Sequence, residues 1–330
     1  MTDVLILGGT GWLSGRIARR WADDGAAVTC LARGERPEPP GVTLVRGDRD
    51  RSDAYDRLAR DWDHVVDVSS RADHVAAAVA ALGARARRWT YVSSVSVYAD
   101  EATPGADESA PVHQAAVPGD AYDYAAEKVA AEEHVRTLGD RALIVRPGLI
   151  VGDGDPSDRF GYWAAAFARA GSDRVLLPPL EGRATQVIDV DDLAAYVVTA
   201  SSAGVRGAVN AVGDRHPLRE VLLRIRNAAG HRGETVVGDD DWLADHGVAY
   251  WAGERSLPLW LPADMTGFMT RSNAAFHRTG GVLRSIDDTI ARVVADEIAR
   301  GVDRERRAGL AREDERALLA GLTRAEPPLR

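Results

Sequence analysis

The sequence contains little cysteine, no long apolar run and no excess of positive charge, and each shortage excludes a class of protein. The single cysteine, Cys30, excludes an internal disulfide and any metal cluster built from cysteines, and we expect no bound metal. No apolar run is long enough to span a bilayer, and no basic stretch follows Met1, so we expect a cytoplasmic protein without a signal peptide or membrane partner. The net charge of −9 argues against a nucleic-acid partner, which would require a basic surface.

Lysine is nearly absent as well. Lysine and arginine together number 41, and only one of them, Lys128, is lysine. Arginine supplies positive charge everywhere else, so a lysine at this position indicates chemistry that a guanidinium cannot perform. The alternative is an unimportant surface lysine on a helix.

What is present is a regular alternation of strands and helices over the first 150 residues. Strands are predicted at Val4–Leu7, Val28–Leu31, Val42–Val45, Val65–Val68, Trp89–Val92 and Ala142–Val145, and helices at about 12–23, 53–60, 73–83 and 121–138. Such spacing predicts βαβ units, and hence an α/β fold with a Rossmann-type, doubly wound parallel sheet. Residues 100–119, rich in Ala, Pro, Gly and Asp, are predicted to form an excursion loop near the carboxyl ends of the strands.

The first strand leads directly into a glycine-rich turn, Gly8–Gly15, and then a helix. Gly8 and Gly11 provide the tight turn and the close backbone approach with which a helix N-terminus holds a pyrophosphate. Ser14, a small residue, takes the place of the usual third glycine. No lysine follows the glycines, which excludes a P-loop. The turn therefore predicts a dinucleotide site.

The end of the second strand indicates which dinucleotide is bound. NAD-binding proteins place an Asp or Glu there, on the ribose hydroxyls. This chain has Ala32 and Arg33 instead, with Arg36 close by, so a guanidinium is available for a 2′-phosphate. We therefore predict NADP in preference to NAD. After the third strand, Asp48 is either an acceptor for the adenine amine or a plain turn residue.

The second half of the chain is less regular. Two further helix and strand pairs are predicted, a helix at 189–200 with a strand at Ala208–Ala211 and a helix at 217–229 with a strand at Thr235–Val237, and the last 45 residues have a charged helical pattern. We assign residues 1–150 to an NADP-binding core. Residues 151–330 are assigned mainly to a smaller C-terminal substrate-binding lobe, with some late core elements and a helical C-terminus. A homodimer is left open.

Tyr124 lies four residues before Lys128 in a segment of high helix propensity, so both side chains share one helix face about 6 Å apart. A phenol has a pKa of about 10 and is a poor base at neutral pH. A neighbouring ammonium stabilises the phenolate and lowers that pKa, which makes Tyr124 a candidate acid/base. The same ammonium could hold the nicotinamide ribose. After the strand ending at Val92, the serines of Ser93–Ser96 could orient a substrate carbonyl, or could simply be turn residues.

Taken with the run Ser93–Tyr98 and the strand end Arg146–Gly152, these motifs resemble the extended short-chain dehydrogenase/reductase family, the NAD(P)-dependent epimerases and dehydratases. The resemblance covers about residues 1–215 well. It implies that Ser94, four residues before Tyr98, is the active-site hydroxyl, and that Pro147 borders the nicotinamide. The expected catalytic residues are Ser94, Tyr124 and Lys128. The expected cofactor-binding residues are Gly8, Thr10, Gly11, Trp12, Leu13, Arg33, Asp48, Arg49, Ser69, Lys128 and Pro147.

Departures from the family pattern bear on the reaction. Dehydratases of the family have an Asp-Glu pair after the hydroxyl residue, where this chain has Val95 and Ser96. Epimerases that retain NAD usually keep the ribose-binding acid, which is Ala32 here. The resemblance therefore implies an NADP(H)-dependent carbonyl reductase or alcohol dehydrogenase acting on a small molecule. The alternatives are a sugar or sugar-nucleotide epimerase and a non-catalytic NADP-sensing regulator.

The segment after the Arg146–Gly152 strand end is where the family contacts substrate. Arg159 and Tyr162 are candidate substrate residues there, together with Ser96 after the fifth strand. Arg159 with nearby aromatic rings could hold an anionic or ring-bearing substrate. The competing interpretation is that the aromatic side chains pack the second lobe.

Overall fold

The computed structural model describes residues 1–325, which form two compact units. Unit 1 consists of Met1–Ile150, Val187–Asp214 and Thr270–Leu283. Among the described residues, unit 2 consists of Val151–Gln186, Arg215–Met269 and residues 284–325.

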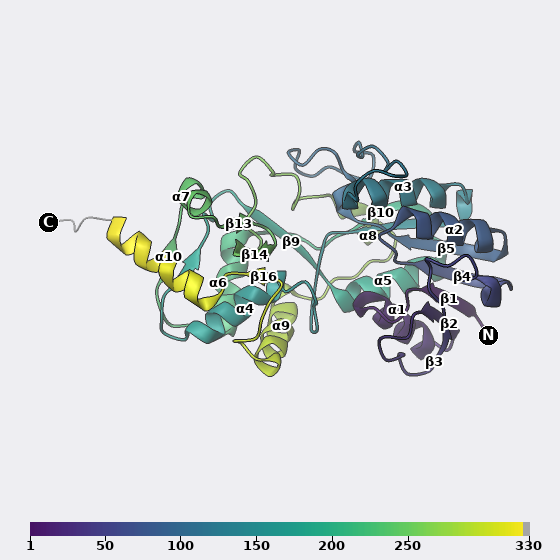
Figure 1. The fold of residues 1–330 in the computed structure, drawn as a ribbon, viewed down its shortest axis with the longest axis horizontal. Helices are drawn as coiled ribbons and strands as arrows, with labels where there is room; N and C mark the ends of the chain where they lie inside the picture. Colours follow the sequence, from purple (N-terminus) through teal and green to yellow (C-terminus); the bar gives the residue numbers. More distant parts are fainter. Residues whose placement is uncertain (326–330) are drawn as a thin grey trace. The chain divides into compact units, whose positions relative to one another are not determined.

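Unit 1 is built on a parallel sheet of seven strands in the order β10-β6-β5-β4-β1-β2-β3 (Figure 1). The strands are β1 (Asp3–Leu7), β2 (Ala27–Ala32), β3 (Val42–Arg46), β4 (Trp62–Asp67), β5 (Ala86–Val92), β6 (Ala142–Pro147) and β10 (Gly207–Ala211). The strand order reverses on either side of β1, and such a reversal is where open α/β sheets bind ligands at the carboxyl ends of their strands. The predicted doubly wound sheet is confirmed.

Helices cover both faces of this sheet (Figure 1). They are α1 (Trp12–Asp23), α2 (Ala72–Leu82), α3 (Tyr124–Arg136), α5 (Val190–Ala203) and the short α8 (Ala274–Arg278). Alternate residues of β1 enter two separate cores, because successive side chains of a strand point to opposite faces. Val4 and Ile6 pack in the core that includes α1 and α5, and Leu5 and Leu7 in the core that includes α2 and α3. A strand buried on both faces explains why β1 is apolar throughout.

The helix predicted at 53–60 was wrong. Only a single 3₁₀ turn forms there, Asp56–Leu58. Leu58 is buried, and its carbonyl accepts a hydrogen bond from the Trp62 indole at 3.0 Å. Tyr55 is also buried, and its hydroxyl is bonded to Arg49. These tertiary contacts outweigh the local helix propensity of the segment.

Unit 2 combines helices with short strands. Its helices are α4 (Arg159–Ala170), α6 (Leu218–Ala228), α7 (Asp240–Asp245), α9 (Ile286–Arg300) and α10 (Arg312–Ala325). Its strands are β8 (Val175–Leu177), β11 (Arg215–Pro217), β12 (Thr235–Val237), β13 (Ala249–Tyr250), β14 (Gly253–Glu254), β15 (Ser256–Leu257) and β16 (Ala308–Gly309). The first two passages of the chain between the units lie within β7 (Leu149–Val151) and β9 (Ala184–Asp189), and the others follow Asp214, Met269 and Leu283.

A buried carboxylate organises one side of unit 2. Glu297 on α9 is 2% exposed and forms ion pairs with Arg304 and Arg306, each at 2.8 Å. Gly161 on α4 faces it, and a Cβ there would lie 2.4 Å from Glu297 Oε1. The glycine is therefore needed for the close packing of α4 and α9.

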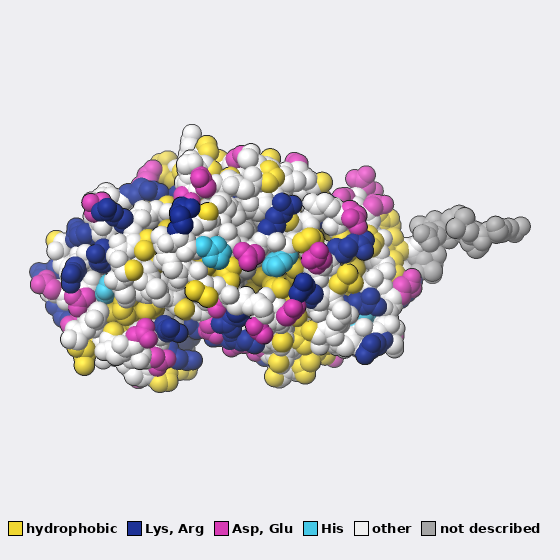
Figure 2. All heavy atoms as spheres, turned by 180° about the vertical axis from the view of Figure 1, so that it is seen from behind, with side chains coloured by type: hydrophobic (Ala, Val, Ile, Leu, Met, Phe, Trp, Pro, Cys, Tyr) yellow, Lys and Arg dark blue, Asp and Glu magenta, His cyan; other side chains and the backbone are white. Residues whose placement is uncertain are grey.

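The surface of the described residues carries both signs of charge. Figure 2 shows basic and acidic side chains scattered among one another over the face in view. Within residues 1–325, no helix has the length and apolar character needed to cross a membrane. The same residues contain no group of three or more His, Cys, Asp or Glu side chains that could hold a metal ion.

Candidate functional site

The glycine turn has the geometry of a phosphate-binding loop. Gly8 has a φ of +86°, a conformation that L side chains rarely adopt. A Cβ on Gly9 would lie 2.2 Å from Cys30 Sγ, so this position has no room for a side chain. Ser14 Oγ accepts a hydrogen bond from Gly11 N at 3.0 Å and donates one to Gly8 O at 2.6 Å. The serine that replaces the third glycine therefore closes the turn.

Helix α1 begins directly after this turn. Gly11 is its N-cap, and no acidic residue stands in the first turn of the helix. The positive end of the helix dipole is thus left for an external anion. The residues present fit the pyrophosphate of a dinucleotide.

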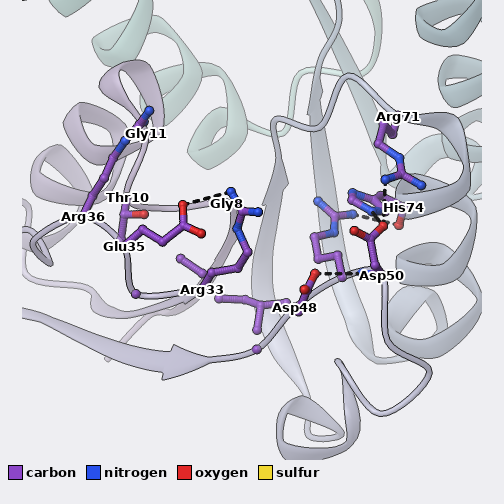
Figure 3. A pocket seen from close by; sticks show the side chains of 15 residues that line it. Gly8, Thr10, Gly11, Arg33, Glu35, Arg36, Asp48, Asp50, Arg71 and His74 are labelled. Carbon is purple, nitrogen blue, oxygen red and sulfur yellow. Dashed lines mark hydrogen bonds and ion pairs between the residues drawn. The ribbon is translucent and has the colours of Figure 1, made fainter. Parts of the chain in front are cut away.

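A pocket of about 420 Å³ lies in unit 1 beside the turn. Its wall comes from the turn itself, from the loops after β2 and β3, and from the start of α2 (Figure 3). Six of the expected cofactor residues line it, namely Gly8, Thr10, Gly11, Arg33, Asp48 and Arg49. The other five do not line this pocket, namely Trp12, Leu13, Ser69, Lys128 and Pro147.

Two guanidinium groups border the pocket beside the glycine turn. Arg36 extends alongside Gly11, where an added Cβ would lie 3.9 Å from Arg36 Nη1 (Figure 3). Arg33 is ion-paired with Glu35, with 3.0 Å between Nη2 and Oε2. Both members of that pair are more than half exposed, so the pair contributes little stability and can be broken by a ligand. Glu35 was not anticipated, although it follows Arg33 by two residues.

The opposite wall of the pocket carries a cluster that sequence reasoning missed (Figure 3). Asp50 Oδ1 lies 2.7 Å from Arg71 Nη1 and 2.8 Å from His74 Nε2. The hydrogen bond to His74 is the main cause of a lowered pKa at Asp50. One signal was available, since these residues follow β3 and β4, and the carboxyl ends of parallel strands meet at one edge of a sheet.

Arg49 lines the pocket but is already bound to protein groups. Its Nη1 and Nη2 donate to the two oxygens of Asp67, each at 2.8 Å. Its Nε donates to Tyr55 at 3.0 Å. Asp67 at the end of β4 is fully buried, so the bidentate pair is what satisfies its charge. Arg49 thereby fixes the loop after β3 against β4.

Helix α3 starts at Tyr124, three residues later than expected. Asp123 is the N-cap, and its side chain accepts a hydrogen bond from Ala126 N at 2.8 Å. An aspartate in this position stabilises the first turn through both the hydrogen bond and the helix dipole. Tyr124 is consequently the first helical residue, and its side chain is 43% exposed.

Lys128 lies one turn into the same helix and is 3% exposed, which rules out a surface lysine. Its Nζ donates to Val92 O at 2.7 Å and to Ser69 O at 2.8 Å. The same nitrogen lies 5.9 Å from the centre of the Tyr124 ring and 4.7 Å from that of Tyr91. The ammonium thus joins α3 to the carboxyl ends of β4 and β5.

The surroundings of Lys128 change its acidity. Burial lowers its pKa to about 7, while the negative charges of Asp67 and Glu132 act in the opposite direction. A lysine that titrates near neutrality is unusual and is typical of functional sites.

The serines after β5 have different partners. Ser93 Oγ donates to Glu132 at 2.6 Å. Ser94 is the N-cap of a 3₁₀ turn, Val95–Val97, where its Oγ accepts from Ser96 N and donates to Ser96 Oγ, both at 3.1 Å. Ser94 and Ser96 therefore bond only locally among the described residues, whereas Ser93 is bound in the interior.

The candidate substrate residues of unit 2 differ from each other. Arg159 is partly buried, and its guanidinium carbon lies 5.0 Å from the centre of the Trp251 ring. Tyr162 is 1% exposed, and its ring lies 5.0 Å from that of Trp163. An added Cβ on Gly309 would lie 2.0 Å from the Tyr162 ring. Tyr162 therefore packs within unit 2, which favours the competing interpretation.

Known proteins resemble this chain in sequence and in fold. A curated relative, the ceramide reductase of Caulobacter vibrioides, is 30% identical over 62% of this chain and 63% of its own length. The match thus spans less than two thirds of that relative.

Two solved structures illustrate the likeness in fold. The UDP-Glc/GlcNAc 4-epimerase of Campylobacter jejuni has a TM-score of 0.70 at 12% identity, over 91% of this chain and 100% of its own. The UDP-glucose 4-epimerase of Thermus thermophilus, solved in complex with NAD, has a TM-score of 0.64 at 19% identity, over 89% and 98%. At these identities the likeness establishes the fold alone. A family model, however, matches residues 4–213, and the chain belongs to the NAD dependent epimerase/dehydratase family.

Proposed function

We propose that this protein is an NADP(H)-dependent oxidoreductase that reduces a carbonyl group of a small molecule to an alcohol. The observation that carries the proposal is the buried ammonium of Lys128 one helical turn after the exposed phenol of Tyr124. A half-exposed tyrosine can meet a substrate, and a buried cation beneath it can tune its acidity.

In the proposed reaction Tyr124 is the proton donor. When bound, NADPH supplies a hydride from its nicotinamide to the carbonyl carbon. The electron pair of the breaking π bond moves to the carbonyl oxygen, which takes the proton of the Tyr124 hydroxyl. Lys128 stabilises the phenolate that remains, since a positive charge nearby favours the charged form of the phenol. The products are an alcohol and NADP⁺.

Ser94 is the proposed substrate-orienting hydroxyl. Its partner Ser96 is two residues away, so exchanging that local bond for one to a carbonyl oxygen requires only a hydroxyl rotation. A donor directed at the oxygen that gains charge lowers the barrier of the reaction. Ser96, the hydrogen-bond partner of Ser94, is proposed to contact the remainder of the substrate.

The preference for NADP rests on the charge beside the glycine turn. Among residues 1–325, Arg36 forms no hydrogen bond or ion pair, and the side chain of Arg33 is bonded only to the exposed Glu35. Either guanidinium can form charge-assisted bonds to a 2′-phosphate.

Reduction is favoured over the other reactions of the family by two kinds of observation. Val95 and Ser96 stand where the dehydratases of the family have an acid pair, which argues against dehydration, and Ala32 stands where NAD-retaining epimerases usually keep the ribose-binding acid, which argues against epimerisation. The matched relative is named a ceramide reductase, and a ceramide is an amphipathic molecule. Because the proposed reaction reduces a carbonyl group, an amphipathic ketone is the first substrate class to try.

The epimerase and the non-catalytic NADP sensor remain the competing functions. NADPH deuterated at C4 of the nicotinamide is incubated with ketones and aldehydes, and NADP⁺ is incubated with sugar nucleotides; the two arms together separate all three. In the first arm we expect stoichiometric oxidation of NADPH and deuterium at the carbinol carbon of the product. Epimerised sugar without net reduction of NADP⁺ in the second arm would identify an epimerase, and tight NADP binding without turnover of any compound would favour the sensor.

A further inference from the structure

Glu132 lies one turn beyond Lys128 on α3 and has no part in the proposed reaction. It is 2% exposed and is held on all sides by hydrogen bonds. Oε1 accepts from Ser93 Oγ at 2.6 Å and from Arg146 Nε at 2.8 Å. Oε2 accepts from Arg146 Nη2 at 2.6 Å and from Arg136 Nη2 at 3.0 Å.

The partners of Glu132 belong to the elements that carry the proposed site. Ser93 directly follows β5, which ends at Val92, and directly precedes Ser94. Arg146 lies in β6 and directly precedes Pro147. One carboxylate thus joins the helix of Tyr124 and Lys128 to the ends of two neighbouring strands. The third partner, Arg136, lies on α3 itself and reaches no other element through this bond.

The network continues from the far side of Arg146. Arg146 Nη1 donates to Tyr98 OH at 2.9 Å, and that hydroxyl donates to Asn210 Oδ1 at 2.6 Å. Tyr98 ends the run that begins with Ser93. The two ends of the Ser93–Tyr98 segment, which contains Ser94, are therefore both attached to the Glu132–Arg146 pair.

Stability alone is a poor reason for this arrangement. Desolvating two charges offsets much of their attraction, and apolar side chains of similar volume often stabilise a fold as well or better. What a fully bonded buried pair does provide is a single geometry.

We propose that Glu132 is a positioning residue that sets the place of Ser94 relative to Tyr124 and Lys128. The proposal rests on the proposed function, because it assumes that these three side chains act on one substrate. In this proposal the hydrogen bond from the Ser93 hydroxyl to Glu132 on α3 fixes where the next residue, Ser94, lies relative to that helix. Ser93, Glu132 and Arg146 do not line the dinucleotide pocket, so we expect the network to affect kcat more than the affinity for NADPH.

Ser93→Ala and Arg136→Ala form a matched pair for the test. Each variant removes one hydrogen bond from Glu132 and leaves the Glu132–Arg146 pair intact, but only Ser93 lies beside the proposed catalytic residue Ser94. We expect Ser93→Ala to lower kcat about tenfold, with the dissociation constant for NADPH and the melting temperature close to wild type. Misplacement of a catalytic group by a fraction of an ångström is enough for such a loss. Arg136→Ala is expected to keep kcat within about twofold.

A second variant tests the carboxylate itself. Glu132→Gln keeps the shape of the side chain and removes its charge, and we expect a larger loss of kcat than in Ser93→Ala. Equal kcat values for the Ser93 and Arg136 variants would overturn the proposal. So would a Glu132→Gln/Arg146→Met double variant that regains both melting temperature and full kcat, because the pair would then be only structural.

Amide hydrogen exchange separates this proposal from the proposed function. If the wild type reduces no carbonyl compound, the proposed function fails, but the amides of residues 94–98 still report on the geometry. Faster exchange there in Ser93→Ala than in Arg136→Ala supports the positioning role. Indistinguishable exchange in the two variants refutes it.

Discussion

Tyr124 and Lys128 lie one turn apart at the start of α3, with the Lys128 ammonium 5.9 Å from the centre of the Tyr124 ring. The tyrosine is 43% exposed and the lysine 3% exposed. The pair therefore presents a phenol at the surface of unit 1 over a charge held in its interior.

Replacing Lys128 by arginine should abolish most of the activity. Arginine is used at all the other Lys/Arg positions of this chain, so the loss would be specific to this site. The site holds a compact ammonium between the carbonyls of Ser69 and Val92, and a planar guanidinium does not fit those two acceptors in the same space. We expect kcat to fall at least about a hundredfold, as for loss of an acid/base partner. Circular dichroism would check that the variant folds, and a folded variant with normal kcat would contradict the assignment.

The lowered pKa of Lys128, about 7, predicts opposite pH trends for activity and stability. The proposed reaction needs the protonated lysine, so kcat/KM for NADPH should fall as pH rises through about 7. The unfolded lysine has a pKa of about 10.4, so between these values the unfolded state binds more protons, and the free energy of unfolding should rise with pH.

Urea unfolding at several values between pH 7 and 9 measures the stability trend. The rise in the free energy of unfolding should be smaller in Lys128→Met, which lacks the titrating group. If both proteins show the same dependence, Lys128 does not titrate in this range.

Cofactor choice should depend on Arg36. A charged hydrogen bond contributes about 1.5–3 kcal/mol, so Arg36→Ala should weaken NADPH binding about ten- to a hundredfold and leave NADH unchanged. Glu35→Gln should have the reverse effect on NADPH, because it frees Arg33 and removes a negative charge from the pocket. Fluorescence titrations with both cofactors decide the matter, and an equal loss for NADH in Arg36→Ala would refute a 2′-phosphate contact.

Gly9 should tolerate no side chain. Its Cβ would lie 2.2 Å from Cys30 Sγ and 2.7 Å from Cys30 Cβ, and overpacking of this kind costs about 1–3 kcal/mol. Gly9→Ala should therefore lower the melting temperature. Adding Cys30→Ala should restore only part of it, since the contact with Cβ remains. Full recovery would show that the sulfur alone causes the clash.

Much of unit 1 could be predicted because its signals are local. The apolar run at Val4–Leu7, the glycines after it and the spacing from Tyr124 to Lys128 each reflect a rule about neighbouring residues. The helix predicted at 53–60 does not form, and the Trp62 indole donates a hydrogen bond to the carbonyl of Leu58 there. Helix propensity describes single residues and cannot include such a contact.

What escaped prediction joins residues far apart in the chain. The Asp50, Arg71 and His74 cluster and the Glu132–Arg146 pair form only once the parallel strands are placed side by side. The choice between packing and substrate contact for Tyr162 was open in the sequence for the same reason, because its burial depends on Gly309 in a distant segment.

The most direct test of the central claim compares two neighbouring tyrosines. Tyr122 is 59% exposed and lacks a lysine one turn later, so Tyr122→Phe is the matched control for Tyr124→Phe. The measurement is kcat for NADPH-dependent reduction of the best carbonyl substrate found. We expect Tyr124→Phe to lose at least about a hundredfold in kcat, as for removal of a general acid, while Tyr122→Phe stays near wild type. Equal activity in the two variants would contradict the proposed mechanism.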